Sequence, residues 1–485
     1  MQYINGLWVE HGSHRFTSTN PATGGELWQG WAAGPAEITA AVSAARAAFA
    51  PWSARSVAER HEILSKFKVL VDDQREALAE LIAKETGKAW WDARSEVAAV
   101  VAKLTYTTEA YEERTGEKSR TTAVGTAMVR HRPHGVLAVY GPYNFPAHLP
   151  NGHIMPALLA GNCLIFKPSE QTPTVGEWLM RQWEAAGLPA GVLNLVQGEK
   201  DTGVALAQSA VDGILFTGSS ATGKLLHEQL AGRPEIILAL EMGGNNPLIL
   251  GPVDDLPAAV HETLLSAFTG TGQRCTCARR LVVIEDTNTE PYLDLLVRSA
   301  KSLRVGAFDE SPAPFMGPLI SMKEAERILQ AQQMMVDKGG EVLLEATLLR
   351  PGLPFLSPAI IDVTNAVDIP DEEYFGPLLQ VYRVAGAQEA VERANATRFG
   401  LSAGILCDDA ALFQQLSNNL RAGLINWNRQ TTGASGAGPF GGIGCSGNHR
   451  PAGYYAADYC AYPVASVHAP GLALPPELPP GMVIG

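Results

Sequence analysis

The sequence predicts an α/β protein with two large domains, and three observations support this class. From Val136 onward, short apolar segments alternate with helix-length segments, which is typical of parallel strands buried on both faces. The chain has 485 residues, well above the ~150 of a common single domain. Its composition also shifts near Gly243-Gly-Asn-Asn-Pro247, where a second alternating series begins.

The N-terminal third is expected to be largely helical. Residues 3–9 predict two short strands around a turn at Asn5-Gly6, and residues 20–25 predict another turn. Apolar residues then recur every three or four positions from Ala36 to about Glu112, with Gly87 ending one helix. We expect these helices to cover one face of a sheet.

The rest of the chain divides into a hairpin, two strand–helix series and a tail. Residues 115–132 are polar and β-prone, which favours a hairpin-like excursion. In the second series, from Pro247 to about Ala437, strand centres are expected near Val282, Leu343, Leu379 and Gly404. The proline-rich segment beyond Ala461 predicts an extended tail. In the first series, strands are expected over 136–140, 163–166, 192–196 and 213–216, with helices over 150–160, over 175–186 and from residue 201.

Charge and cysteine content exclude several classes of protein. The 37 basic and 50 acidic residues give a formal charge of −13, so nucleic acid and anionic membrane are poor partners. Six cysteines in so long a chain do not form a disulfide framework, and the C-x-C pair at Cys275 and Cys277 lacks a second Cys/His pair for zinc. No metal is therefore expected. Without a signal peptide or an apolar run of ~18 residues, we expect a cytoplasmic protein.

The segment from Gly270 to Arg280 is the main candidate for chemistry. It places Cys275 and Cys277 after glycines and beside three arginines. A thiol is a nucleophile as its thiolate, and nearby positive charge lowers its pKa. The alternative is a structural thiol, because free cysteine is among the most buried residue types. These residues alone leave both interpretations open.

Two further residues after predicted strands suit catalysis. The amide of Asn144, held between Pro142 and Pro146, could be a positioned donor, although asparagine is also common in turns. Glu241 lies at an apolar strand end beside glycines. Burial there should raise its pKa, which suits a general base, and the alternative is a helix cap or a buried ion pair.

Two other motifs suit a nucleotide. Lys167 and Glu170 follow a strand, where ligands of open α/β sheets bind, and could hold ribose hydroxyls or form a solvated pair. A strand–turn–helix junction offers glycines and free helix N–H groups to a phosphate, or is an ordinary tight turn. Its residues are Gly218, Ser219, Ser220, Ala221, Thr222 and Gly223.

Taken in order, these motifs resemble the aldehyde dehydrogenase superfamily over nearly the whole chain. Each motif is short, but the ordered set is specific. The matching motifs are Tyr143-Asn-Phe-Pro146, Lys167-Pro-Ser-Glu170, Phe216-Thr-Gly-Ser219, Leu240-Glu-Met-Gly-Gly244, Gly272-Gln-Arg-Cys275, Glu372-Glu-Tyr-Phe-Gly-Pro377 and Pro439-Phe-Gly-Gly442.

The resemblance implies catalytic roles. Cys275 would attack the aldehyde carbon and form a thiohemiacetal. The Asn144 amide and the Cys275 backbone N–H would hold the oxyanion. After hydride transfer, Glu241 would activate the water that hydrolyses the thioester.

The resemblance also implies NAD as the cofactor. Lys167 and Glu170 would bind the adenosine ribose, and residues 218–223 would face the pyrophosphate. Glu373 would hold the nicotinamide ribose, with Phe375 against the ring. A carboxylate at Glu170 would repel a 2′-phosphate, which favours NAD over NADP.

The implied architecture is a Rossmann-like cofactor domain, an α/β catalytic domain and a small β excursion for oligomerisation. The cofactor domain would comprise residues 1–114 and 134–243, and the catalytic domain residues 244–449. Residues 115–133 and 450–485 would pair strands across a homodimer or a dimer of dimers.

Longer segments resemble one subgroup of the family, the N-succinylglutamate 5-semialdehyde dehydrogenases of bacterial arginine catabolism. They include residues 130–136, 148–153, 273–280 and 447–451. An anionic semialdehyde substrate of this kind needs guanidinium or other polar donors. The alternatives for these donors are surface ion pairs or ordinary turn chemistry. The candidates are His148, Asn151, Arg114, Arg429 and Ser435.

Other functions remain open at this point. A related dehydrogenase would act on succinate or glutamate semialdehyde. A cysteine esterase would need no cofactor, but the Phe216-Thr-Gly-Ser219 motif would then have no role. A structural protein with this fold would be expected to have lost at least one of Cys275, Glu241 and Asn144.

Overall fold

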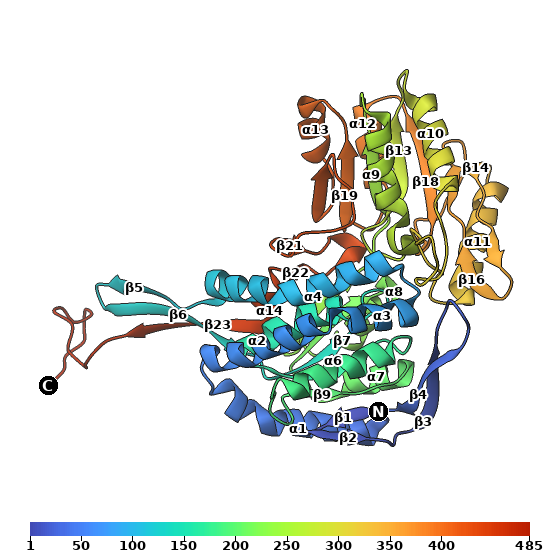
Figure 1. The fold of residues 1–485 in the computed structure, drawn as a ribbon. Helices are drawn as coiled ribbons and strands as arrows, with labels where there is room; N and C mark the ends of the chain where they lie inside the picture. Colours follow the sequence, from blue (N-terminus) through green and yellow to red (C-terminus); the bar gives the residue numbers. More distant parts are fainter.

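Two seven-stranded sheets organise the chain (Figure 1). The structure is a computed structural model and describes residues 1–485. The first sheet has the order β11-β10-β7-β8-β9-β1-β2, in which β7 to β11 run parallel and β1 and β2 add an antiparallel edge. Its strands are β1 (Gln2–Ile4), β2 (Leu7–Val9), β7 (Val136–Tyr140), β8 (Cys163–Lys167), β9 (Leu193–Leu195), β10 (Gly213–Gly218) and β11 (Ile237–Met242).

Helices cover this sheet, and the predicted helical N-terminal third is confirmed. Gly87 ends α3 in the left-handed conformation, with φ of 78°. One element was not predicted: β3 (His14–Thr19) and β4 (Glu26–Ala32) form a hairpin around the predicted turn at residues 20–25. The helices are α1 (Pro35–Ser53), α2 (Val57–Asp73), α3 (Arg75–Thr86), α4 (Trp90–Ala110), α5 (His148–Ala160), α6 (Pro173–Ala185), α7 (Lys200–Gln208) and α8 (Ser220–Gln229).

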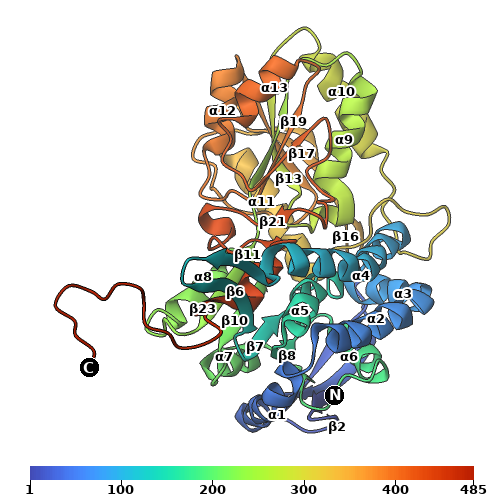
Figure 2. The ribbon, with the colours of Figure 1, turned by 90° about the vertical axis from the view of Figure 1, so that its left-hand side faces the viewer.

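The second sheet has the order β14-β17-β18-β13-β12-β19-β20 and is parallel except for β14. The strands predicted around Val282, Leu343, Leu379 and Gly404 are confirmed. Figure 2 shows α9 and α10 on one side of the sheet, with α12 and α13 on the other. The elements are β12 (Asn246–Leu250), α9 (Leu256–Phe268), β13 (Ala278–Ile284), α10 (Thr289–Lys301), α11 (Met322–Asp337), β14 (Glu341–Leu344), β17 (Ala359–Asp362), β18 (Leu378–Val384), α12 (Ala387–Asn395), β19 (Ser402–Leu406), α13 (Ala410–Ser417) and β20 (Leu424–Trp427).

The chain passes from one sheet to the other at residues 243–245. Strand β11 lies at the edge of the first sheet, whereas β12 lies inside the second. A Cβ on Gly243 would lie 1.7 Å from a carboxylate oxygen of Glu373, so any larger residue there would displace this carboxylate. The crossover therefore brings the carboxyl ends of the parallel strands of the first sheet, where ligands of such sheets bind, close to the amino ends of β12 and β13 in the second sheet.

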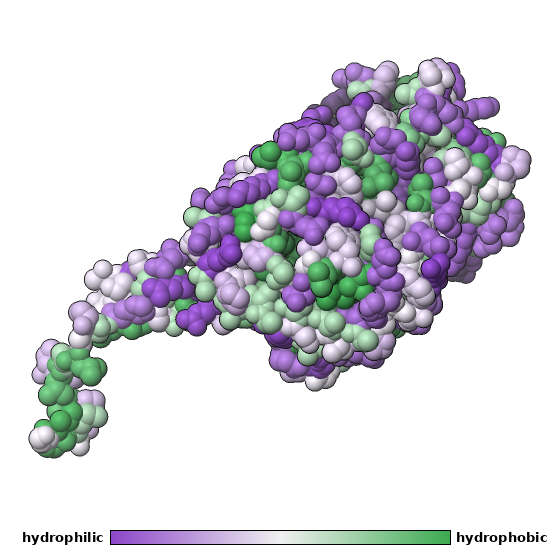
Figure 3. Space-filling model, turned by 60° about the horizontal axis from the view of Figure 1, so that its bottom comes forward, coloured by the Kyte–Doolittle hydropathy of each residue, from purple (hydrophilic) through white to green (hydrophobic).

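A three-stranded antiparallel ribbon projects from the body (Figure 1). It pairs β5 (Lys118–Thr122) with β6 (Gly125–Pro133), and β6 with β23 (Ala461–His468), which follows α14 (Ala456–Cys460). The predicted hairpin is thus confirmed. Residues 469–485 form neither helix nor strand, and apolar side chains of this tail, including Leu472 and Val483, are exposed (Figure 3). None of the helices combines the length and the apolar character that crossing a bilayer requires.

Candidate active site

Cys275 lies in a loop between a short 3₁₀ turn, η2 (Thr269–Gly272), and β13. Residues 270–272 have φ values between 59° and 69°, an unusual conformation for Thr271, which is not a glycine. The side-chain amide of Asn246, on β12, donates to the carbonyls of Cys275 at 2.7 Å and Cys277 at 2.9 Å. The loop is therefore held from the second sheet.

The three arginines around Cys275 have different partners, and two of them hold the loop. Arg279 donates to the carbonyl of Gly272 at 2.6 Å and to that of Arg274 at 3.0 Å. Arg280 donates only to main-chain carbonyls, at 2.8 to 2.9 Å. Arg274 forms an ion pair with Asp92 of α4. Most of their donors are thus engaged by carbonyl groups and one carboxylate, although the Nε atoms of Arg274 and Arg279 have no partner in the protein.

The expectation of a low thiol pKa at Cys275 is wrong for this arrangement, because burial outweighs the positive charge. Burial raises the pKa of Cys275 to about 12, and the negative charges of Glu373 and Glu241 add to the increase. Arg274 acts in the opposite direction but has less effect. The thiol is therefore protonated at neutral pH, and the structure brings two carboxylates close enough to influence it.

Glu241 is the penultimate residue of β11 and lies in a nearly closed environment, with 4% of the residue exposed. One carboxylate oxygen accepts a 3.3 Å hydrogen bond from the Ala452 N–H, and the other has no hydrogen-bond partner in the protein. Burial raises the pKa of Glu241 well above its usual value, as predicted. A Cβ on Gly441 would lie 2.8 Å from the bonded oxygen, so glycine leaves room for this carboxylate.

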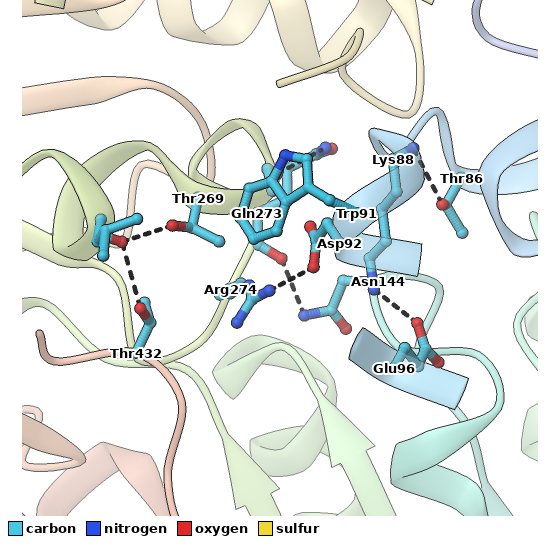
Figure 4. Close-up of polar contacts among 12 residues, drawn as sticks. Thr86, Lys88, Trp91, Asp92, Glu96, Asn144, Thr269, Gln273, Arg274 and Thr432 are labelled. Carbon is cyan, nitrogen blue, oxygen red and sulfur yellow. Dashed lines mark hydrogen bonds and ion pairs between the residues drawn. The ribbon is translucent and has the colours of Figure 1, made fainter. Parts of the chain in front are cut away.

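Asn144 lies against the loop that carries Cys275, which we call the nucleophile loop after the role that the sequence predicts for Cys275. Its side-chain amide donates to the carbonyl of Gln273 at 3.0 Å (Figure 4). Gln273 is anchored in turn, because its side-chain oxygen accepts from the N–H of Ile320 at 3.0 Å. The hydrogen bond to Gln273 uses one amide hydrogen of Asn144 and leaves the second one free.

Lys167 and Glu170 meet at the carboxyl end of β8. The Lys167 ammonium lies 3.8 Å from a Glu170 carboxylate oxygen and donates to the Pro168 carbonyl at 3.1 Å. Lys167 is buried, and burial lowers its pKa, whereas 47% of the Glu170 side chain is exposed. A buried donor beside an open carboxylate suits a ligand that carries vicinal hydroxyls.

The glycine-containing junction is a strand, turn and helix start, as predicted. Strand β10 ends at Gly218, and the Ser219 hydroxyl caps α8 by accepting from the Thr222 N–H at 3.2 Å. The second glycine serves packing, because a Cβ on Gly223 would lie 2.3 Å from the Met242 sulfur. The small residue brings α8 close to β11, and the intervening residues Ser220 and Ala221 form the first turn of the helix.

Glu373 and Phe375 lie on the loop that precedes β18. A Glu373 oxygen accepts from the Gly244 N–H at 3.2 Å, and burial raises the pKa of this carboxyl to about 7. The Phe375 and Tyr143 rings lie edge to face, with 6.1 Å between their centroids. The Arg279 guanidinium lies 5.3 Å from the centroid of the Phe375 ring. Glu373 therefore contacts the crossover between the sheets, and Phe375 contacts residues close to Asn144 and Cys275.

The five residues predicted to bind the substrate lie at three separate places in the structure. His148 and Asn151 lie on α5, where both amide atoms of Asn151 are buried without a hydrogen-bond partner. Arg429 and Ser435 line a cavity of about 630 Å³ beside α9 and β20. Arg114 is engaged elsewhere, since it pairs with Asp458 at 2.7 Å and lies 3.4 Å from the Tyr455 ring centroid.

Sequence analysis missed the charged residues around the site. Lys88 pairs with Glu96 at 2.6 Å, with 7% and 0% of the side chains exposed, and Asp92 pairs with Arg274 (Figure 4). Lys103 is buried as well. A usable signal was the spacing of charged residues on one face of an otherwise packed helix. No group of three or more His, Cys, Asp or Glu side chains is placed to bind a metal ion.

Residues 8–463 match the aldehyde dehydrogenase family. The chain belongs to this family. It is 54% identical over 481 residues to N-succinylglutamate 5-semialdehyde dehydrogenase of Burkholderia ambifaria, and the match covers 99% of both chains. The protein of the same name from Paraburkholderia xenovorans matches to the same extent.

Solved aldehyde dehydrogenase structures share the whole fold. A variant of an aldehyde dehydrogenase from Bacillus cereus has a TM-score of 0.90 at 32% identity, with 96% of this chain and 95% of that chain covered. PnpE, from Pseudomonas sp. WBC-3, has been solved in complex with nicotinamide adenine dinucleotide. That complex has a TM-score of 0.91 at 30% identity, with 98% of each chain covered. The aldehyde dehydrogenase fold implied by the sequence motifs is confirmed.

Proposed function

We propose that this aldehyde dehydrogenase oxidises N-succinylglutamate 5-semialdehyde to N-succinylglutamate with NAD. The observation that carries the chemistry is the convergence of Cys275, Glu241 and Asn144 at the crossover between the sheets. The substrate assignment is supported by full-length relatives of this name at 54% identity. A cofactor-free esterase would leave the Lys167–Glu170 pair and the turn before α8 without a role.

The cofactor assignment rests on two features of the first sheet. Lys167 and Glu170 offer a donor and an acceptor to ribose hydroxyls, and the N-terminus of α8 offers free N–H groups to a pyrophosphate. The Glu170 carboxylate would repel a 2′-phosphate. When bound, NAD supplies the hydride acceptor. Glu373 and Phe375 would contact its nicotinamide half.

The first half-reaction uses Cys275 and Asn144. The Cys275 thiol gives its proton to water and its sulfur bonds to the aldehyde carbon, while the carbonyl oxygen becomes an oxyanion. The free amide hydrogen of Asn144 and the Cys275 N–H stabilise this oxygen. The carbon then loses a hydride to the acceptor, the C=O bond re-forms, and a thioester remains on Cys275.

The second half-reaction uses Glu241. Its unpartnered oxygen takes a proton from water as that water attacks the thioester carbon. The Cys275 sulfur leaves as the thiolate, and the product is a carboxylic acid. A carboxyl with a raised pKa suits this step, because it binds the proton strongly enough to remove it from water.

We propose that His148 and Asn151 contact the anionic part of the substrate. Both residues lie in the first turn of α5, and an amide with no hydrogen-bond partner in the protein is available to bind a ligand. The positive charges of Lys103, Lys88 and Arg274 all act on His148, and together with burial they lower its pKa to about 3. Lys88 and Arg274 are already paired with Glu96 and Asp92, so Lys103 is the cation whose charge remains to attract an anion in a chain whose net charge is −13.

For the domains, we propose residues 1–114 and 134–243 for NAD binding and residues 244–449 for catalysis. The ribbon and residues 450–485 would mediate oligomerisation. The outer edge of β5 is unpaired and its residues are largely exposed, which suits pairing with a second copy. Sedimentation of the wild type and of Ser119→Pro, which removes a backbone N–H that faces away from β6, tests this. An unchanged oligomer, or a wild-type monomer, would contradict it.

The decisive experiment compares initial rates of NADH formation with four aldehydes. They are N-succinylglutamate semialdehyde, succinate semialdehyde, glutamate semialdehyde and a plain aliphatic aldehyde. We expect kcat/KM to favour the succinylated substrate by about 100-fold, or about 2.7 kcal/mol. Equal rates on all four would contradict the substrate assignment while leaving the family chemistry intact.

A second experiment addresses the cofactor. Glu170→Gln removes the charge and keeps the size of the side chain. We expect kcat/KM with NADP to rise at least about 10-fold relative to NAD, because the repulsion of a 2′-phosphate is lost. An unchanged ratio would contradict the proposed role of Glu170.

A further inference from the structure

Helix α4 carries three charged residues that are nearly completely buried. Asp92 and Glu96 are 1% exposed, and Lys103 is 5% exposed. Their spacing of four and seven residues places them within about 40° of one another around a helix with 3.6 residues per turn. Burying charge is costly unless each group is well partnered. The partners of these three residues lie in different segments of the candidate active site.

Asp92 holds the nucleophile loop. Its carboxylate pairs with Arg274, the residue before Cys275, and both side chains are at most 10% exposed. The second oxygen of Asp92 faces the start of the same loop, since a Cβ on Gly270 would lie 3.1 Å from it. One carboxylate thus lies against both ends of the turn that leads to Cys275.

Glu96 holds the turn that contains Asn144. One carboxylate oxygen accepts from the N–H groups of Ala147 at 2.9 Å and His148 at 3.1 Å, where α5 begins. The other oxygen pairs with Lys88 at 2.6 Å, and the Lys88 ammonium lies 3.5 Å from the centroid of Phe145. The residues on the C-terminal side of Asn144 are therefore held through one carboxylate.

Lys103 holds the segment that supports Glu241. Its ammonium donates to the carbonyl of Gly453 at 3.0 Å, in the short strand β22 (Ala452–Gly453). The preceding N–H, that of Ala452, is the hydrogen-bond donor to Glu241. Lys103 forms no ion pair with a carboxylate, so its ammonium serves this carbonyl.

We propose that α4 is the positioning element of the active site. Through Asp92, Glu96 and Lys103, one rigid helix sets the nucleophile loop, the amide donor and the base at fixed distances across two sheets. These are positioning residues, because they act through Arg274, the α5 N-terminus and β22. The proposal rests on the roles proposed above for Cys275, Asn144 and Glu241.

The proposal predicts different kinetic defects for different residues of one helix. Single-turnover NADH formation reports the first half-reaction, and steady-state turnover after a burst reports thioester hydrolysis. Lys103→Met should lower the steady-state rate about 10-fold or more and produce a burst of about one NADH per site. Glu96→Leu combined with Lys88→Met should slow the single turnover about 10-fold to 100-fold, without a burst.

Conservative variants separate positioning from general stability. Glu96→Gln combined with Lys88→Met removes the same charge pair but keeps an oxygen that accepts from Ala147 and His148. It should turn over within about 3-fold of the wild type. Lys103→Gln keeps a donor for Gly453 and should show no burst. Glu109→Gln, at an exposed position of α4, is the matched control and should behave as the wild type.

These experiments test the role of α4 independently of the substrate assignment. The measurements use whichever aldehyde the wild type oxidises fastest, so failure with the succinylated substrate does not affect them. Equal slowing of both half-reactions in Lys103→Met and in the Glu96→Leu pair would overturn the proposal. Equal activity of the two double variants, in which Lys88→Met is combined with either Glu96→Leu or Glu96→Gln, would also overturn it. If Lys103→Met fails to fold, a burst in Lys103→Gln would overturn the Lys103 assignment, and its absence would support it.

Discussion

The Asn144 side-chain amide donates a 3.0 Å hydrogen bond to the main-chain carbonyl of Gln273, two residues before Cys275. Asn144 follows β7 of the first sheet, and Gln273 precedes β13 of the second. The bond thus joins the two halves of the molecule at the proposed oxyanion site. It also fixes the orientation of the amide before any substrate binds, which is the condition for efficient electrostatic stabilisation.

Replacing Asn144 should therefore affect the rate far more than the fold. Asn144→Ala is expected to lower kcat about 10²-fold to 10³-fold, the usual loss for one oxyanion donor. NADH formation measures the rate, and thermal unfolding checks the fold. Asn419→Ala, an exposed asparagine after α13, should keep full activity. A kcat within about 3-fold of the wild type in Asn144→Ala would contradict the assignment.

The reactivity of Cys275 should depend on pH in a particular direction. Because its pKa is raised to about 12, the thiolate fraction of the ligand-free enzyme should increase about tenfold per pH unit between pH 7 and 10. Iodoacetamide inactivation should follow that slope. Glu373→Gln removes a negative charge beside the thiol and should accelerate alkylation at pH 8. A plateau below pH 9, or slower alkylation of the variant, would contradict this.

Glu241 should control thioester hydrolysis. Its raised pKa means that the basic form is lost as pH falls, so wild-type steady-state turnover should decline toward acid pH. Glu241→Gln should slow turnover about 10²-fold or more and leave a burst of NADH. The pH dependence of its residual turnover should also be flatter. Stopped-flow absorbance at several pH values measures both effects, and the absence of a burst would exclude the assigned role.

The packing of α8 on β11 should tolerate no side chain at Gly223. An alanine Cβ would lie 2.3 Å from the Met242 sulfur, so Gly223→Ala should cost about 1 to 3 kcal/mol of unfolding free energy and weaken NAD binding. Met242→Ala in the same chain should recover most of the loss. Gly232→Ala is the control, because a Cβ there has no atom within 4 Å. Equal stability of the two single variants would disprove this account.

The fold was largely predictable because its signals are local. Apolar runs such as residues 136–140 and 163–166 predict buried parallel strands, and the structure has strands at both. Gly87 ends its helix for a reason visible in the sequence, since glycine favours the left-handed conformation. The hairpin of β3 and β4 was missed because its polar, partly exposed strands lack a strong alternating pattern.

The candidate site was predictable only in part. The raised pKa of Glu241 followed from an apolar strand end, which the sequence displays. The expected low pKa of Cys275 did not follow from the neighbouring arginines. Proximity in the sequence does not determine the direction of a guanidinium group. The guanidinium groups of Arg279 and Arg280 donate to main-chain carbonyls.

By itself, the sequence determined the α/β class, the order of the elements, the family and the residues that carry the proposed chemistry. These depend on local periodicity and on short motifs, which a linear chain displays completely. The tertiary structure alone decided how Asp92, Glu96 and Lys103 of α4 reach the nucleophile loop, the start of α5 and strand β22. It also decided that burial outweighs positive charge at Cys275. Both are long-range effects: partners lie up to 350 positions apart, and solvent exclusion depends on everything that packs around a group.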